Sequence, residues 1–251
     1  MSRIIDGKIS CMKALGIETS GNRGGIALLD GGKVLKEILL KKGMVHGKLL
    51  IAAIDKALKT CRWKKTDIDL IAVDIGPGSY TGLRVGLAAA KMMSYLLNIP
   101  MVGVSSLDAL MQEINTKHLI ACPVIDARWN QVYTAIYRKN AAGWKKVTDF
   151  MAITPSELAK LLKEYSLKYG KTDKSPNIIL FGDGLLSYNN ILNGLPGIES
   201  GSEKYWYPKP ANIVRLGYKR WHNKQKDTYW EINPLYLRKT EAEITLKKVK
   251  K

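Results

Sequence analysis

Cysteine is scarce in this chain, and long apolar runs are missing from it. The three cysteines among the 251 residues, Cys11, Cys61 and Cys122, lie far apart and form no CxxC pair. Disulfide frameworks and zinc sites need closely spaced or paired cysteines, so we expect neither. No apolar run approaches the roughly 18 residues of a membrane span, and the first twelve residues lack the apolar stretch of a signal peptide. These absences predict a protein of the reducing cytoplasm with no membrane association.

Histidine is equally rare, and its spacing argues against a metal site. His46, His118 and His222 are the three histidines, and each lies more than five residues from the others. Two histidines one helical turn apart can share a metal ion, because both side chains then lie on one face of the helix. The chain has no such pair, and no Ser–His–Asp or Cys–His arrangement stands out. We therefore expect no metal ligands and no catalytic residues.

Acidic residues are outnumbered, and 40 basic residues against 22 acidic ones leave a formal net charge of +18. The excess is concentrated in two segments: Lys204–Lys251 holds 13 basic and 4 acidic residues, and Asp30–Lys65 holds 10 and 3. Such segments could meet the phosphate backbone of a nucleic acid. A basic proteome, or lysines retained for solubility, explains the same composition. Composition does not decide between these interpretations.

Apolar runs separated by turn signals predict the order of secondary structure. Between residues 13 and 104 this order is three strands, a helix, a strand, a helix and a strand, with a hairpin turn at Asp30-Gly31-Gly32. Antiparallel strands followed by parallel crossovers are typical of the mixed sheets of actin-like and sugar-kinase-like domains. The sequence therefore predicts an α/β fold with mixed sheets flanked by helices.

The second half of the chain repeats this order at low sequence similarity. Two further strands are expected at Leu119–Asp126 and Gln131–Tyr137, a helix opens at Thr154 and Pro155, and one more helix is expected after Ala211. We therefore predict two lobes, residues 12–107 and residues 108–251, the second of which carries the basic tail. The preceding residues 1–11 form an extension of unknown role.

The segment Asp74–Gly86 reads DIGPGSYTGLRVG and joins a predicted strand to a predicted helix. Its glycines allow a tight path, and Ser79 or Thr81 could cap the first helical turn. Free amide groups at that turn, together with the helix dipole, would favour an anion. The alternative is a glycine corner that lets helix and strand pack closely. The segment matches neither a GxGxxG fingerprint nor a Walker A loop.

The overlapping stretch of residues 76–91 reads GPGSYTGLRVGLAAAK. It is similar, nearly residue by residue, to the signature of the TsaB family. Further stretches that resemble the family lie in register along the chain, so the match covers roughly Met12 to Ala242. They are Gly16–Ser20, His46 with Leu49 and Leu50, Asp126–Arg128 with Val132 and Tyr133, Gly182–Gly184 and Pro234–Arg238.

The resemblance implies a two-lobed actin-like ATPase (ASKHA, ribonuclease H-like) fold that has lost much of the ATPase equipment. It also implies a non-catalytic subunit in the formation of N6-threonylcarbamoyladenosine at position 37 of ANN-decoding tRNAs. The expected partners are a TsaD-like catalytic subunit in a heterodimer, a TsaE-like ATPase and tRNA through the complex; a homodimer of this chain is an alternative state. ATP or ADP and a metal are expected in the partner subunits, and no cofactor in this one.

The first-turn acid of this chain, Glu18, departs from the aspartate that is common in the family. In ATPases of this class an aspartate here helps to hold magnesium through water, and a longer side chain would displace the ion. We therefore expect a degenerate nucleotide or phosphate turn, made of Glu18, Thr19, Ser20, Gly76, Gly78, Ser79, Thr81 and Gly82.

The helix after the glycines is apolar almost all round, which suggests cover on a second side. Gly86, Ala89, Ala90 and Met93 form a ridge of small or adaptable residues that permits close helix packing. We expect this ridge and the preceding helix to bind the partner subunit, although the second lobe of the chain is an alternative cover. The expected interface residues are His46, Leu49, Leu50, Ala53, Ile54, Ala57, Leu83, Gly86, Ala89, Ala90 and Met93.

The basic C-terminal segment is expected to face tRNA in the complex, because lysine and arginine neutralise phosphates. The residues concerned are Lys209, Arg215, Lys219, Arg220 and Lys224. Two other functions stay open. One is a small-molecule kinase of the same fold, which would recruit Glu18, Asp74 and Asp183. The other is a free-standing basic RNA-binding protein, although no RNP, KH or zinc-knuckle pattern supports it.

Overall fold

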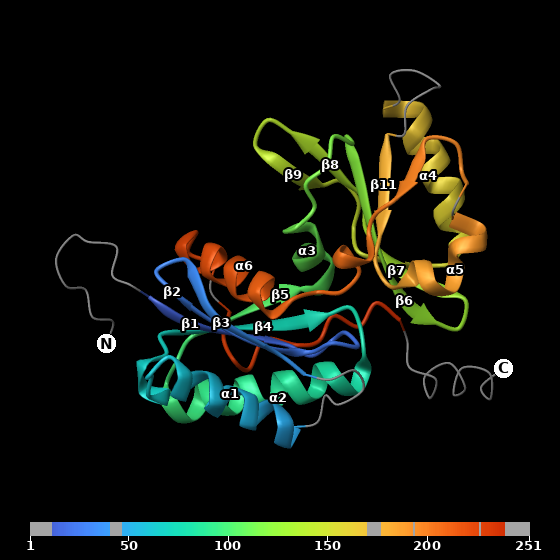
Figure 1. The fold of residues 1–251 in the computed structure, drawn as a ribbon. Coiled ribbons are helices and arrows are strands. Elements are labelled where there is room, and N and C mark those ends of the chain that lie inside the picture. Colours follow the sequence, from blue (N-terminus) through green and yellow to red (C-terminus); the bar gives the residue numbers. More distant parts are fainter. Residues whose placement is uncertain (1–11, 41–46, 170–176, 193, 226, 239–251) are drawn as a thin grey trace. The chain divides into compact units, whose positions relative to one another are not determined.

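The computed structural model describes residues 12–40, 47–169, 177–192, 194–225 and 227–238 (Figure 1). The chain forms two compact units: Met1–Asn115 with Lys204–Pro234, and Thr116–Glu203 with Leu235–Lys251. A single boundary after residue 107 was predicted, and the structure differs from this prediction. Helix α6 (Pro210–His222) joins the first unit, because its apolar face packs on strands β1, β2 and β4 of that unit.

Unit 1 is built on a mixed five-stranded sheet of order β3-β2-β1-β4-β5. The first three strands pair antiparallel, and β4 and β5 continue in parallel with β1, as in actin-like and ribonuclease H-like domains. The predicted hairpin turn is confirmed, with positive φ angles of 53° at Gly31 and 87° at Gly32. The strands are β1 (Lys13–Glu18), β2 (Gly25–Asp30), β3 (Lys33–Leu39), β4 (Leu70–Gly76) and β5 (Met101–Ser105).

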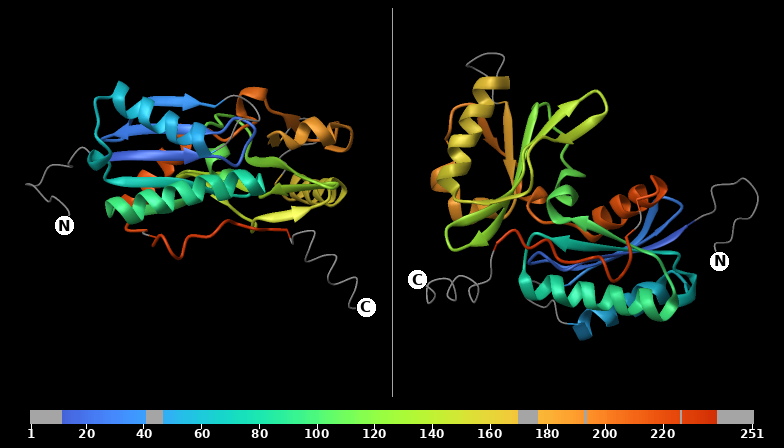
Figure 2. Two further views of the ribbon diagram at one scale, coloured as in Figure 1. Left: turned by 90° about the horizontal axis from the view of Figure 1, so that it is seen from below. Right: turned by 180° about the vertical axis from the view of Figure 1, so that it is seen from behind.

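Helices cover both faces of this sheet (Figures 1 and 2). Side chains alternate between the faces of a strand, so Leu15 and Ile17 pack towards α1 and α2, whereas Ala14 packs towards α6. Gly16 lies under α6, where an added Cβ would meet Val214 Cβ at 2.7 Å. On one face lie α1 (Gly47–Thr60) and α2 (Tyr80–Leu97), and on the other lie α3 (Ser106–Met111) and α6; a 3-10 turn, η1 (Lys65–Asp67), precedes β4.

Unit 2 is built around the long strand β6, which pairs in parallel with β11 and antiparallel with β7 and β8. Residues 131–137 were predicted as one strand, but two strands form because the chain leaves β7 after Thr134 and pairs again with β6 from Tyr137. The strands are β6 (Ile120–Arg128), β7 (Gln131–Thr134), β8 (Tyr137–Asn140), β9 (Gly143–Lys146), β10 (Met151–Ile153), β11 (Ile178–Phe181) and β12 (Ile198–Ser200).

The helices of unit 2 begin at α4 (Pro155–Tyr169), which follows the predicted cap at Thr154. Thr154 Oγ1 accepts from the Glu157 amide at 3.2 Å, and Glu157 Oε2 accepts from the Thr154 amide at 2.8 Å, which makes a capping box. Helix α5 (Gly184–Leu192) follows β11, and the turn η2 (Glu203–Tyr205) leads back to unit 1. Within the described ranges no helix is long and apolar enough to cross a membrane.

Candidate functional site

The glycine-rich turn lies in unit 1, between the end of β4 and the start of α2. Ser79 is the N-cap of α2, and its Oγ accepts a hydrogen bond from the Gly82 amide at 3.2 Å, which confirms its predicted capping role. Thr81 lies exposed in the first turn of the helix. The sequence thus positions one helix N-terminus against the turn that follows β1.

The space that the glycines leave is filled by the Thr19 and Ser20 turn of the same chain. An added Cβ would lie 2.0 Å from the Thr19 carbonyl oxygen at Gly82, and 2.1 Å from Thr19 Oγ1 at Gly86. At Gly78 it would lie 2.7 Å from the Ser20 carbonyl oxygen. The Ser79 amide donates to that same Ser20 oxygen at 2.8 Å. These contacts support the close-packing interpretation of the glycines over an open anion site.

Two fully buried carboxyl groups, Glu18 and Asp74, lie beneath this turn. Glu18 Oε1 accepts from the Ser20 amide at 2.7 Å, the Ser20 hydroxyl at 2.8 Å and the Gly21 amide at 2.9 Å. Asp74 Oδ1 accepts from the Gly76 amide and from the Ser106 hydroxyl, each at 2.7 Å. Both acids are therefore tied to neighbouring backbone and hydroxyl groups.

Burial, and after it the nearby charge of Asp74, raise the pKa of Glu18 to about 8. Burial also raises the pKa of Asp74 to about 6, against hydrogen bonds from Gly76 and Ser106 that lower it. Burial therefore favours the protonated form of both acids.

A magnesium nucleotide does not fit this arrangement. Its phosphates would use the amides of the α2 N-terminus, and two of these, from Ser79 and Gly82, already donate within the chain. Its ion would need an accessible carboxylate, whereas both acids are fully buried. In the part of the chain that the structure describes, no three His, Cys, Asp or Glu side chains are grouped so that they could hold a metal ion.

Most of the described residues that were expected at the partner interface instead face the core of unit 1 and are buried there. The helices use their small and branched residues to approach their own sheet: Ala90 is fully buried, and Gly86 rests on Thr19. Leu49 is exposed, Ala89 and Met93 are half-buried, and His46 lies outside the described residues. The buried ones are Leu50, Ala53, Ile54, Ala57, Leu83, Gly86 and Ala90.

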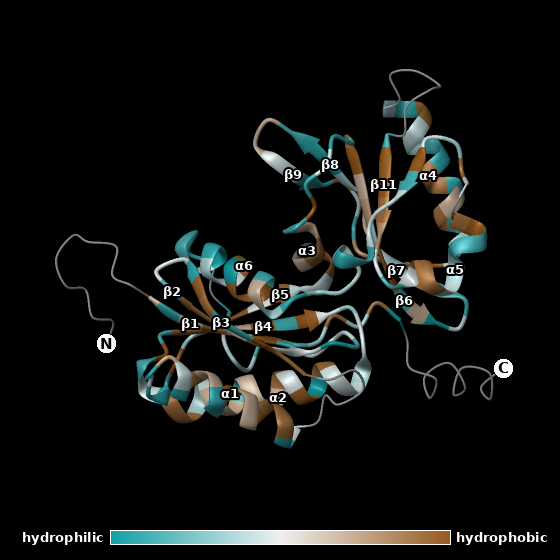
Figure 3. Cartoon of the chain, viewed as in Figure 1, coloured by the Kyte–Doolittle hydropathy of each residue, from teal (hydrophilic) through white to brown (hydrophobic). Residues whose placement is uncertain are grey.

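A different apolar face, which the sequence reading did not assign, is exposed on the outer side of α2. Met92, Tyr95 and Leu96 are 60%, 64% and 68% exposed, and Trp230 is 63% exposed. The Tyr95 ring centroid lies 5.7 Å from that of Tyr229, which in turn lies 4.7 Å from that of Trp230. The spacings of three and four among residues 92, 95 and 96 are the sequence signal that could have revealed this face. Figure 3 shows apolar residues along both α1 and α2. We call Met92, Tyr95, Leu96 and Trp230 the outer α2 face.

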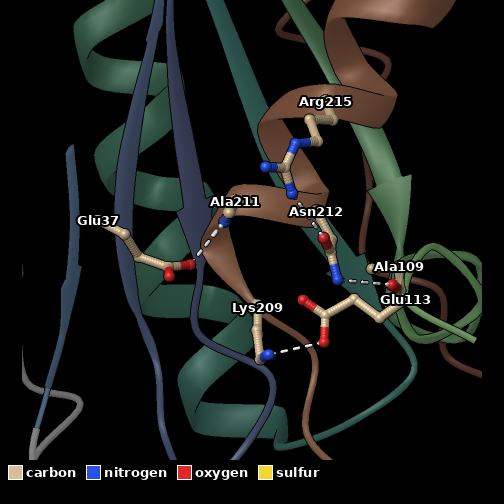
Figure 4. Close-up of polar contacts among 7 residues, drawn as sticks. All are labelled: Glu37, Ala109, Glu113, Lys209, Ala211, Asn212 and Arg215. Carbon is tan, nitrogen blue, oxygen red and sulfur yellow. Dashed lines mark hydrogen bonds and ion pairs between the residues drawn. The ribbon is translucent and has the colours of Figure 1, made fainter. Parts of the chain in front are cut away.

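The cations that were predicted to face tRNA divide into two groups. Lys209 Nζ lies 2.6 Å from Glu113 Oε2, at the start of α6 (Figure 4). Arg220 donates to the Gly103 carbonyl, and its Nη2 lies 3.7 Å from Asp227 Oδ2. These two side chains therefore hold α6 and the following segment to unit 1.

The other cations of α6 and its C-terminal turn are exposed: Arg215, Lys219 and Lys224. Arg215 Nη1 lies 3.4 Å from Asn212 Oδ1, and Asn212 donates through Nδ2 to the Ala109 carbonyl at 3.2 Å (Figure 4). These three cations are the exposed part of the predicted basic surface, and Arg215 also donates a hydrogen bond to Asn212.

The mixed sheet and the filled glycine turn define a protein of the actin-like ATPase fold whose glycine-rich turn is packed against its own chain. YeaZ from Pseudomonas aeruginosa has the same fold, with a TM-score of 0.74 and 20% identity over 90% of this chain and 100% of that one.

The chain belongs to the TsaD family, tRNA N6-adenosine threonylcarbamoyltransferase, whose model matches residues 41–246. It is 29% identical over 236 residues to the Bacillus subtilis tRNA threonylcarbamoyladenosine biosynthesis protein TsaB, covering 92% of this chain and 96% of that protein. The Haemophilus influenzae protein of the same name is 25% identical over 248 residues, covering 94% and 96%. These matches confirm the resemblance to TsaB that the glycine-rich segment indicated.

Proposed function

We propose that this chain is a non-catalytic subunit that pairs with a TsaD-like threonylcarbamoyltransferase in the formation of N6-threonylcarbamoyladenosine at position 37 of ANN-decoding tRNAs. Relatives that match nearly its whole length are named for threonylcarbamoyladenosine biosynthesis. The observation that carries the non-catalytic role is the filled glycine turn, in which Thr19 and Ser20 occupy the space beside α2. The same observation weighs against a small-molecule kinase of this fold, which would need the turn after Glu18 to be open for nucleotide phosphates.

The outer α2 face is the proposed docking surface for the partner. Three large apolar side chains on adjacent helical turns, with an exposed tryptophan beside them, form the kind of patch that marks a protein interface. The TsaD family model covers residues 41–246, so a TsaD-like partner has counterparts of α1 and α2. Two such helix pairs could pack face to face across a pseudo-twofold axis.

Gel filtration of the mixed proteins tests this surface. Leu96→Asp places a charge in the middle of the outer α2 face and should abolish co-elution with the TsaD-like protein, because a buried unpaired charge costs about 3–5 kcal/mol. Leu167→Asp is the matched control, since Leu167 is 75% exposed on α4 of unit 2. Co-elution of the Leu96→Asp variant at wild-type affinity would rule out this face. If the variant abolished only self-association, the face would belong to a homodimer.

We propose that nucleotide and metal chemistry belong to the partner subunits, which include a TsaE-like ATPase. The isolated chain should show no ATP turnover above a buffer blank and no stoichiometric zinc or iron by elemental analysis. Turnover above about one per second, near the lower end of usual enzyme rates, would contradict the proposal.

Transfer RNA is proposed to bind the assembled complex. Arg215, Lys219 and Lys224 supply exposed positive charge on unit 1, and each could neutralise a phosphate. Removal of their charges should weaken tRNA binding without loss of partner binding.

A further inference from the structure

The β8–β9 hairpin of unit 2 is a basic ribbon without acidic residues. Residues 137–146 read YRKNAAGWKK and contain four cations. Arg138 and Lys145 are paired directly across the two strands, so both side chains lie on the same face of the hairpin. Both side chains are exposed. Like charges directly opposite each other destabilise a strand pair, so a requirement of the fold alone does not account for them.

Helix α4 brings a third cation to the same place. The Arg138 guanidinium lies 5.3 Å from the ring centroid of Tyr169, and Lys168 Nζ lies 5.5 Å from that ring. Attraction of a cation to an aromatic ring restrains both charged groups around the half-buried tyrosine. We call Arg138, Lys145, Lys168 and Tyr169 the ribbon cluster.

No carboxylate neutralises this cluster among the described residues. The ion pairs of the described chain use Lys13, Lys65, His118, Lys209 and Arg220, and none involves a cation of the cluster. Its local excess of positive charge is therefore uncompensated. Lysine on β9, which pairs with β8 alone, also discourages pairing with other chains, but this does not explain why Arg138 and Lys168 converge on one ring.

We propose that the ribbon cluster binds the phosphodiester backbone of RNA. Arg138 can engage a phosphate through two parallel N–H groups, while Lys145 and Lys168 act as point charges on neighbouring phosphates. Contacts of this kind position an RNA without reading its sequence. The identification of that RNA as tRNA rests on the proposed function, whereas the site itself rests on the geometry of unit 2.

Two triple variants that remove equal charge test the site. The first carries Arg138→Gln, Lys145→Gln and Lys168→Gln. The second, on α6 and its C-terminal turn, carries Arg215→Gln, Lys219→Gln and Lys224→Gln, which are likewise exposed. Binding of the chain alone to an unmodified tRNA transcript is followed by fluorescence anisotropy at several salt concentrations. Circular dichroism verifies that each variant is folded.

The ribbon variant should raise the Kd for tRNA about 10-fold or more, and reduce the slope of log Kd against log salt by about two to three. The α6 variant should have a smaller effect. Equal losses in both variants would show that only net charge matters, and a loss in the α6 variant alone would place the RNA site there; either result overturns the proposal. The proposal is also overturned if the wild-type chain does not bind tRNA at low salt. It is likewise overturned if the ribbon variant keeps its tRNA affinity and loses only its binding to phosphatidylserine vesicles.

Pairing with the TsaD-like protein is measured on the same preparations by gel filtration. A ribbon variant that pairs normally with the TsaD-like protein and binds tRNA with wild-type affinity would refute the ribbon site and leave the proposed function intact. If the wild-type chain does not pair with the TsaD-like protein but binds tRNA through the ribbon cluster, the proposed function is refuted and the ribbon site stands.

Discussion

The contact between Gly86 and Thr19 allows a sharp test of the filled glycine turn. An alanine methyl at Gly86 would lie 2.1 Å from Thr19 Oγ1 and 3.2 Å from Thr19 Cβ and Cγ2. Thr19 is fully buried, and its hydroxyl has no hydrogen-bond partner among the described residues. The threonine therefore cannot turn away into solvent, and the helix or the β1 turn must move.

The magnitude follows from two opposing terms. Overpacking of this kind costs about 1–3 kcal/mol, and alanine in place of glycine in a helix returns about 1 kcal/mol. Gly86→Ala alone should therefore lower the free energy of unfolding by up to about 2 kcal/mol. Thr19→Ala removes the clashing atoms together with an unsatisfied buried hydroxyl, so the double variant should regain about 1–3 kcal/mol relative to additivity.

Urea unfolding of the wild type, both single variants and the double variant measures this coupling. Gly82→Ala is the control, because its methyl would meet the Thr19 backbone oxygen at 2.0 Å and Thr19→Ala cannot relieve that contact. We expect coupling at Gly86 and none at Gly82. Strict additivity at both positions would refute the inference that Thr19 fills the space beside α2.

Three further predictions follow from the same unit. The pKa of Glu18 is raised by folding, so the native state binds more protons between pH 4.5 and about 8, and stability should fall as pH rises through that window. Glu18→Gln should flatten this dependence in thermal unfolding between pH 5 and 8, and an unchanged pH profile would contradict it. Ala90→Glu, at a fully buried position, should destabilise the chain itself by several kcal/mol, about 3–5, so a wild-type melting temperature would contradict the inward placement of Ala90. Glu113→Gln removes a partly exposed ion pair with Lys209 and should cost no more than about 1 kcal/mol in urea unfolding; a larger loss would mean that the pair anchors α6 more strongly than its exposure allows.

Local signals predicted much of the fold from the sequence. Two glycines with positive φ closed the first hairpin, and Ser79 and Thr154 capped their helices as expected. These features depend on residues that are adjacent in the chain, so local patterns are sufficient to find them.

The orientation of α2 could not be predicted in the same way. A helix that is apolar nearly all round has no single stripe to mark its inner side. From the sequence alone, Gly86 and Ala90 could pack closely either against the chain's own sheet or against another subunit. The contact of Gly86 with Thr19 and the full burial of Ala90 show that they face the sheet. The ribbon cluster depends likewise on strand register and on the end of a distant helix, which no local pattern reveals.

The central claim is that this chain enables catalysis by a TsaD-like partner without catalysing the reaction itself. Incorporation of labelled threonine into unmodified ANN-decoding tRNA measures this directly, in a reconstituted reaction that contains the adenylate-forming enzyme, the TsaE-like ATPase and the TsaD-like subunit. We expect incorporation only when this chain is added, full incorporation with the Leu167→Asp control and none with Leu96→Asp. Incorporation by this chain without the TsaD-like subunit, or full incorporation when this chain is omitted, would contradict the account.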